Sequence, residues 1–382
     1  MLTRSLTLLL LCSVALAAAD YDEAYHPDGS LHYKIKLDRD GLRHGKFVRY
    51  HPGGSEGKKG PKAEVGGYHK GELHGVVSTL DADGTMLSEA QWVNGRCMLP
   101  MTERFISYRL KQIEAAARDS VAALPADGTK RPDPKTLVAV LTRLNHYRLL
   151  CGLDTDVVFD ATAIHEAQCA AEVCAAMGRL DHHPKSNPGV SEERWEAGKT
   201  GCAKSNLAQG SIGTRAIDAW NDDSDNSNRD RLGHRRWQLW PELERFGYGE
   251  EGSFSAGHVI GGGGSSQADV PAVMFPPRGL MPLTMFGAHY CWHLSPDPKR
   301  YDVSKDAKLE IRPYDTQSGK TGEPIPIQYR NVNAAGFGGR PAIIAQPEQI
   351  LLKRMGAFQV TVSGVSKKDA NAPDLEWITI FY

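Results

Sequence analysis

The stretch LGHRRWQLWP gathers several side chains that can do chemistry into ten positions. An imidazole changes its charge near neutral pH and binds metal ions, so His234 is a candidate site residue. Trp237 and Trp240 are expected to pack in the core, because an indole is large and has one N–H donor. Arg235 and Arg236 are expected to pair with carboxylates and to order the loop. The stretch therefore predicts one site residue that packing and ion pairs hold in place.

The preceding run, NDDSDNSNRD at residues 221–230, carries several carboxylates and amides. A calcium loop takes its ligands from alternating positions and needs a glycine at its sharp turn. Asp223, Asp225 and Asn228 do not have that spacing, and the run contains no glycine. We expect a solvated loop here rather than a calcium site.

The first 19 residues have the features of a secretory signal peptide, with basic MLTR, apolar SLTLLLLCSVALA and the small residues of ALAAAD. The apolar part is too short to span a membrane comfortably, so no membrane span is expected. Cys12 follows Leu11, whereas a lipoprotein signal has a small residue before its cysteine, so no lipid anchor is expected. The sequence thus predicts a secreted or extracytoplasmic protein.

Six cysteines follow the predicted signal peptide. An even number of cysteines in an oxidising compartment indicates disulfides, although the connectivity stays open and buried free thiols are the alternative. No C-x-x-C pair occurs, so a structural zinc knuckle is not expected. The six are Cys97, Cys151, Cys169, Cys174, Cys202 and Cys291.

The overall composition is that of an ordinary globular protein, with 41% hydrophobic and 24% charged residues. Its 382 residues indicate two or three domains. The 45 basic and 46 acidic residues leave a net charge of −1. This balance gives no basis for binding nucleic acid or an anionic membrane.

Residues 20–97 repeat short strand-like runs that alternate with glycine turns. Glycine supplies the positive φ that tight turns need, and small units of this kind stack into an extended sheet. The stretch resembles MORN repeats, which mainly mediate contacts, and we expect its repeated histidines to be structural rather than metal ligands. Gly41, His44, Gly45 and Gly54 recur 30 residues later as Gly71, His74, Gly75 and Gly84.

Four segments have the periodicity and the caps of helices. Residues 101–125 form a predicted linker helix that ends at a proline. The next helix is expected to begin after Asp133 as its N-cap, with a proline in its first turn. An alanine-rich helix is expected between Asp160, its cap, and Gly178, its terminator, and another around GTRAIDAW.

These central pieces, in this order, resemble the CAP superfamily of cysteine-rich secretory and pathogenesis-related proteins, in its bacterial secreted variety. The resemblance covers about 135–292, within a CAP-like domain that we delimit at 133–292. It implies a three-layer α-β-α sandwich. The matching pieces are LNHYR, GRLDHHP, SNLAQG, AIDAW and LGHRRWQLWP followed by FGYG.

In the CAP superfamily, two histidines and two acidic residues line an open cleft. The resemblance places the histidines at His182 and His234, and one acidic residue at Asp223. The second acidic position falls on Ser205. This departure removes a carboxylate and weakens any acid–base mechanism taken over from the family.

Two chemistries follow for this cleft. His182 and His234 could share a divalent metal such as zinc, with water or Asp223 completing the set, and the alternative is a polar cleft without metal. Ser205 could act as a nucleophile with His234 as its base, but no G-x-S-x-G motif surrounds it. A capping or loop role is therefore expected for Ser205.

The resemblance also bears on one disulfide. Because the alanine-rich helix and the SNL loop both approach the cleft, Cys202 is expected to pair with Cys169 or Cys174. These two differ by five positions and cannot both face one partner.

Residues 300–382 have the pattern of a small β-sandwich, with short alternating strands at AKLEIRP, IPIQY, FQVTVSG and EWITIFY. The expected fold class is α+β, in which a CAP-type sandwich follows a MORN-like sheet and precedes this β-sandwich.

We expect a secreted, non-catalytic binding protein whose histidine cleft takes a lipid, a glycan or an extracellular protein. The missing second carboxylate favours binding over catalysis. The alternatives are a metal-dependent or serine-type hydrolase of extracellular substrates, and a structural surface protein that acts through its repeats. The sequence leaves the ligand and the oligomeric state open.

Overall fold

The structure is a computed structural model that describes all residues except 1–19, 265–268 and 335. The predicted signal peptide therefore lies outside the described residues. The chain divides into two compact units, Met1–Met98 and Leu99–Tyr382, and each is described by itself. None of the described helices is long and apolar enough to cross a membrane.

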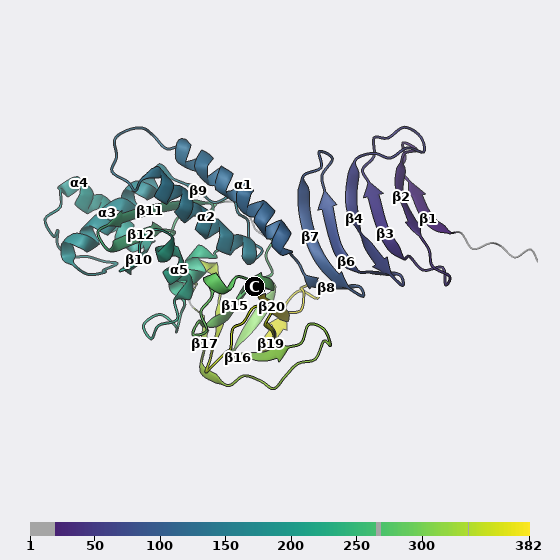
Figure 1. Ribbon diagram of the computed structural model, residues 1–382. Helices are drawn as coiled ribbons and strands as arrows, with labels where there is room; N and C mark the ends of the chain where they lie inside the picture. Colours follow the sequence, from purple (N-terminus) through teal and green to yellow (C-terminus); the bar gives the residue numbers. More distant parts are fainter. Residues whose placement is uncertain (1–19, 265–268, 335) are drawn as a thin grey trace, which may run out of the picture. The chain divides into compact units, whose positions relative to one another are not determined.

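The N-terminal unit is an eight-stranded sheet in the order β1-β2-β3-β4-β6-β7-β8, with β5 on β4 (Figure 1). Its pairings from β1–β2 to β6–β7 are antiparallel. Gly45 and Gly75, the repeated glycines, open β3 and β6 with φ of 85° and 88°, which few side chains tolerate. The antiparallel sheet expected at 20–97 is present, and its kinship with MORN repeats stays a prediction. The strands are β1 (Tyr21–Tyr25), β2 (Leu31–Lys36), β3 (Gly45–Tyr50), β4 (Lys62–His69), β5 (Glu72–Leu73), β6 (Gly75–Leu80), β7 (Met86–Val93) and β8 (Arg96–Leu99).

The second unit begins with a layered α-β-α arrangement around the four-stranded sheet β10-β12-β11-β9. The glycines of β11 let α3 approach one face, since a Cβ at Gly247 or Gly249 would overlap the α3 backbone. Trp220 of α5 covers Gly257 on the other face. The elements are α1 (Glu103–Ala122), α2 (Pro134–Leu150), β9 (Val158–Phe159), α3 (Ala161–Met177), α4 (Glu192–Lys204), β10 (Ser205–Gln209), α5 (Thr214–Asp222), α6 (Gly233–Gln238), β11 (Arg245–Glu251) and β12 (Phe254–His258).

The predicted helix caps are confirmed. The side chain of Asp133 accepts hydrogen bonds at the start of α2, and that of Asp160 does so at the start of α3. Gly178 ends α3 in the left-handed conformation. The sequence analysis did not predict α4, although Ser191 caps it and two glutamates occupy its first turn.

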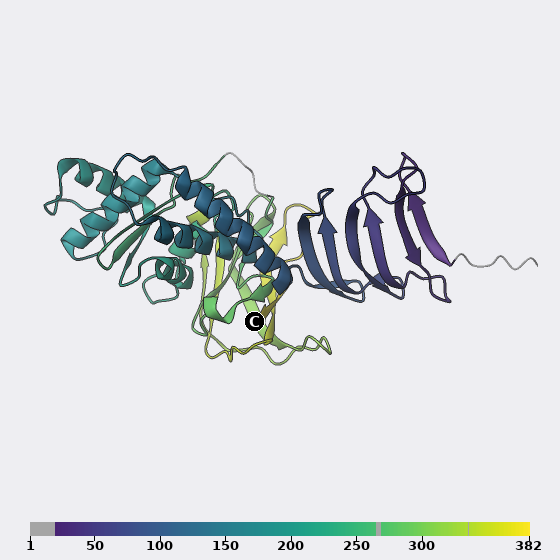
Figure 2. The same ribbon diagram turned by 45° about the horizontal axis from the view of Figure 1, so that its top comes forward.

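The predicted linker helix is α1, and it packs against α2 and β9 within the same unit (Figure 2). The hydroxyl of Ser120 accepts a hydrogen bond of 2.8 Å from the Phe159 backbone. The guanidinium of Arg109 donates to Thr155 at 3.1 Å. These contacts make α1 a structural part of the unit rather than a free connector.

The unit ends in two four-stranded sheets, β13-β15-β18-β17 and β14-β20-β19-β16, which face each other through Trp292, Phe358 and Phe381. Three of their strands come before residue 300, where the sequence predicts the β-sandwich to begin. Two of them pair with strands far along the chain, β14 with β20 and β15 with β18, and β13 pairs with β15. The strands are β13 (Ala272–Phe275), β14 (Gly279–Met281), β15 (Trp292–Pro296), β16 (Tyr301–Tyr314), β17 (Ile327–Asn333), β18 (Ala342–Pro347), β19 (Ala357–Lys367) and β20 (Trp377–Phe381), with short 3-10 helices η1 (Leu283–Met285) and η2 (Phe337–Gly339).

None of the cysteines that the structure describes forms a disulfide, so the expected disulfides are not present. Of the two partners left open for Cys202, Cys174 is its neighbour, with the two sulfurs 4.0 Å apart. Cys169 instead lies beside His165 and Arg194. The packing of α3 on α4 thus places Cys174 and Cys202 next to each other, but no disulfide joins them.

Candidate functional site

A cavity of about 300 Å³ opens where the CAP-like layers meet the C-terminal sheets. Its walls come from the loop after α3, the α4–β10 junction, the segment leading into α6, and η2. Both histidines that the resemblance singled out, His182 and His234, line it. The other lining residues are His183, Ala203, Ser205, Asn206, Asn228, Arg231, Gly233, Trp237, Ile260 and Phe337.

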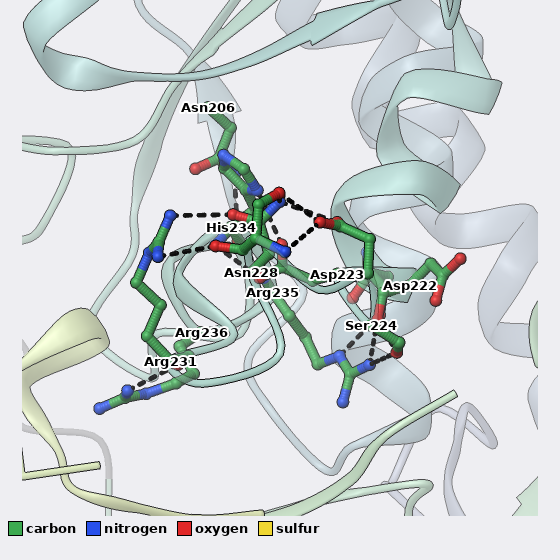
Figure 3. A network of polar contacts seen from close by, with 12 residues as sticks. Asn206, Asp222, Asp223, Ser224, Asn228, Arg231, His234, Arg235 and Arg236 are labelled. Atoms are coloured by element: carbon green, nitrogen blue, oxygen red, sulfur yellow. Dashed lines mark hydrogen bonds and ion pairs between the residues drawn. The ribbon is translucent and has the colours of Figure 1, made fainter. Parts of the chain in front are cut away.

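The ring of His234 is fixed by Asp223, the C-cap residue of α5. The two residues meet at 2.8 Å between His234 Nδ1 and Asp223 Oδ1, and the second carboxylate oxygen accepts the His234 backbone N–H at 2.9 Å (Figure 3). A carboxylate only accepts, so Nδ1 carries a proton, and in the neutral ring the lone pair lies on Nε2. Asp223 is 3% exposed and does not line the cavity. It therefore acts through His234.

The ring of His182 is held in a similar way by a main-chain carbonyl. Its Nδ1 donates to the oxygen of Cys202 at 2.9 Å, which again leaves the lone pair on Nε2. The residue is exposed at its outer edge, but loss of water around the ring lowers the pKa of His182 below its usual value. Nearby His234 lowers that pKa further. His182 is thus neutral at neutral pH.

Residues 141–256 match the family model CAP: Cysteine-rich secretory protein family. This part of the chain is a CAP domain. No curated protein and no solved structure matches the chain. The matched residues hold His182, Ser205, Asp223 and His234, whereas Ile260 and Phe337 lie beyond them. The cavity is therefore built mainly by the CAP domain and closed by other parts of the second unit.

Ser205, at the departure from the CAP pattern, is the C-cap of α4 and the first residue of β10. Its hydroxyl is buried and has no hydrogen-bond partner among the described residues. Its pairing partner across the sheet is His258, whose Nε2 contacts Glu166 at 2.9 Å. A serine nucleophile needs a base within hydrogen-bond reach, and His234 does not make that contact with Ser205. The geometry gives the serine-type hydrolase no support.

The next residue ties β10 to α6. The side-chain amide of Asn206 donates to the backbone oxygen of His234 at 3.0 Å. Asn206 is 2% exposed, so this bond satisfies a buried polar group and fixes the distance between the strand and the helix.

Several residues of the cavity wall were not predicted from the sequence, among them two aromatic side chains and an arginine. Trp237 was expected only to pack, yet it lines the cavity while it also meets Trp240 edge to face at 5.5 Å. Phe337 reaches the cavity from η2 and lies 6.5 Å from the Trp237 ring centroid. Arg231 lines the cavity as well. The tryptophan lay in the opening stretch, but nothing local marks Phe337, which is about a hundred positions away along the chain.

The guanidinium of Arg235 has other partners than the carboxylates that the sequence predicts. Arg235 is fully buried and donates to main-chain oxygens, among them those of Asn221 and Cys291, each at 2.6 Å. Among the described residues no carboxylate accepts from its guanidinium, although Asp223 accepts from its backbone N–H at 3.4 Å. The oxygen of Asn221 is one of the unpaired carbonyls at the C-terminal end of α5, which attract a cation. Arg236 donates to Asn333 at 3.0 Å and to the backbone of Arg231 at 2.8 Å, and so joins the CAP domain to β17.

The run 221–230 divides into a buried and an exposed half. Asp223 is buried, against the expectation of a solvated loop, because it serves His234. Asp225 is exposed and closes a turn by accepting from Ser227 and Asn228. Among the residues that the structure describes, no group of three or more His, Cys, Asp or Glu side chains is placed to hold a metal ion.

Proposed function

We propose that this protein binds an extracellular ligand in the CAP cavity and does not transform it. The observation that carries the proposal is the presence of two imidazoles and two aromatic side chains around one opening. His182 and His234 present acceptor nitrogens, while Trp237 and Phe337 present apolar faces. Concave, mixed surfaces of this kind are typical of small-ligand sites.

The polar groups behind the cavity support binding over catalysis. Both oxygens of Asp223 are engaged by His234, at its ring and at its backbone. The Ser205 hydroxyl has no base in contact with it among the described residues. Asp223 and Ser205 are therefore not placed to exchange a proton with a ligand in the cavity, which acid–base catalysis by either residue would need.

Zinc is the cofactor that these residues could hold, as a weak site. The Nε2 atoms of His182 and His234 supply two nitrogens, and a tetrahedral site needs about four ligands, so water or the bound ligand would have to complete it. Asp223 orients His234 rather than ligating. Calorimetry should give weak zinc binding that the double variant His182→Ala/His234→Ala abolishes.

The cellular setting is part of the proposal. We place the protein outside the cytoplasm, with residues 20–97 mediating contacts and the cavity taking a lipid, a glycan or a segment of an extracellular protein. Support comes from the sequence of the first 19 residues and from the resemblance of the repeats to MORN units. Fusion of residues 1–19 to a reporter enzyme that is active only after export tests the location.

A binding screen tests the function. The full chain is applied to immobilised glycans, to vesicles of neutral and anionic lipids, and to denatured extracellular proteins. We expect one class to be retained, and Trp237→Ala to lose that binding while His44→Ala, an exposed histidine of the N-terminal unit, keeps it. Equal loss in both variants would assign binding to the repeats, and turnover of a retained ligand would make the protein an enzyme.

A further inference from the structure

We infer that the ligand of this cavity is a sugar ring that carries a carboxylate. This inference rests on the proposed function and adds the chemical class of the ligand. It follows from three properties of the lining, namely its charge, its hydrogen-bonding groups and its aromatic walls.

The charge of the lining is positive. Arg231 is a permanent cation, and none of the lining residues that the structure describes is an aspartate or a glutamate. Two carboxylates lie beside the cavity without lining it: Asp223 is held behind His234 by both of its oxygens, and Asp230 contacts the Arg231 guanidinium. An anionic group that enters the cavity therefore meets a cation without meeting a carboxylate on the wall.

The guanidinium of Arg231 has N–H groups that the described residues do not use. It donates through one terminal nitrogen to the Ser227 backbone at 2.9 Å and to Asp230 at 3.2 Å, and through the other to Asn228 at 3.0 Å. A guanidinium has five N–H groups, so about two remain unused by the described residues. The contact with Asp230 is a surface pair, with that side chain 55% exposed, and such pairs contribute little. The guanidinium can therefore form the paired hydrogen bonds that a carboxylate accepts.

The remaining groups suit a polyhydroxylated ring. The bare Nε2 atoms of His182 and His234 accept hydrogen bonds and cannot donate while the rings are neutral, which matches hydroxyl donors. Trp237 and Phe337 stand edge to face, at 77° between their planes, so a ring can lie against one face and abut the other. The volume of about 300 Å³ is at the small end of ligand sites, which fits a sugar unit better than a long acyl chain.

Two matched pairs of sugars test the inference on the full chain by titration followed through Trp fluorescence. Methyl glucuronide and methyl glucoside differ in one carboxylate, and so do N-acetylmuramic acid and N-acetylglucosamine in the lactyl group. We expect the acid of at least one pair to bind about tenfold more tightly than its neutral partner, the effect of about 1.4 kcal/mol. Arg231→Gln should remove that preference and keep the weaker binding of the neutral sugar.

Arg229→Gln is the matched control, because Arg229 lies two positions away but stacks on Tyr329 and does not line the cavity. Equal affinities within both pairs, no binding of any of the four sugars, or equal competition by inorganic phosphate would each overturn the inference. If the protein retains another ligand class and Trp237→Ala loses that binding, the proposed function holds but the inference of an acidic sugar is wrong. A melting temperature unchanged by Arg231→Gln excludes unfolding as the cause of a loss.

Discussion

Asp223 holds His234 at two points, with one oxygen 2.8 Å from the ring Nδ1 and the other 2.9 Å from the backbone nitrogen. Asp223 is the C-cap of α5, and His234 lies in the next helix, α6. The backbone has a positive φ at Asp223 and at Leu232, the residue that caps α6. The carboxylate therefore orders a turn of the backbone and the tautomer of the imidazole together.

Asp223→Asn, compared with Asp225→Asn, which changes the net charge equally, tests these two roles of the carboxylate. An amide has one acceptor oxygen, so it cannot serve both the ring and the backbone N–H of His234. We expect a loss of about 1–3 kcal/mol of unfolding free energy, as for a buried donor left without its partner. Nitrogen NMR of the His234 ring should show a mixture of tautomers. Asp225→Asn, in the exposed turn, is the control, and an unchanged His234 spectrum in Asp223→Asn would argue against the orienting role.

Phe337→Ala tests whether the C-terminal sheets take part in the cavity. Removal of the ring opens the wall opposite Trp237, so we expect ligand affinity to fall by about tenfold, as loss of one aromatic contact allows. The unfolding free energy should fall by less than the ~3–5 kcal/mol of a fully buried phenylalanine, because Phe337 is partly exposed. Leu351→Ala, which removes an exposed apolar side chain of the same region, should change neither quantity.

How far the sequence predicts this molecule depends on the range of the contacts. Helix caps are local, and Asp133, Asp160 and Gly178 were recognisable because a cap acts on backbone groups within four positions. The positions of His182, Asp223 and His234 came from an ordered resemblance rather than from local rules. The resemblance predicts that they lie close together. Their distances and orientations depend on how α3, α5 and α6 pack, which the sequence does not give.

The features that were not predicted depend on contacts between distant segments. The guanidinium of Arg235 donates to carbonyls of α5 and of Cys291, the residue before β15, so its partners could not be predicted from neighbouring residues. Phe337 enters the cavity because η2 packs on α6, beside Gly233. The strands before residue 300 lie with the C-terminal sheets because their partners come later in the chain.

Cys174 and Cys202 should form a disulfide when the protein refolds with oxidised glutathione. In this exchange the two protein thiols give up two electrons and two protons, and glutathione disulfide takes them up to become two glutathione thiols. The sulfurs lie 4.0 Å apart and need to close to about 2.0 Å. The bond would span 28 positions, for which about 3–4 kcal/mol of stabilisation is expected.

Mass spectrometry after alkylation reads out this bond. Cys174→Ser should abolish it and Cys169→Ser should not, since Cys169 contacts His165 and Arg194 instead. Both thiols of the Cys174–Cys202 pair alkylated after refolding would contradict the pairing.

The stability of the second unit should fall in acid because of His146. Burial lowers the pKa of this imidazole to about 4, from a usual value of 6.5 in the unfolded chain. The unfolded chain therefore takes up the proton first, and stability is lost as the pH falls from about 6.5 to about 4. His146→Gln, which cannot titrate, should lessen that loss by an amount on the order of 2 kcal/mol. Urea titrations at pH 7 and pH 4 compare the two proteins, and equal losses would show that other groups govern the acid response.

The most direct test of binding without chemistry is an NMR titration of histidine-labelled protein with methyl glucuronide, palmitate and a short peptide in separate samples. We expect one probe to shift the imidazole signals of His182 and His234 in a saturable way, leave His44 unmoved, and be recovered unchanged after long incubation. If no probe moves either imidazole, or the probe that moves them is recovered cleaved, the account of this cavity as a non-catalytic binding site is wrong.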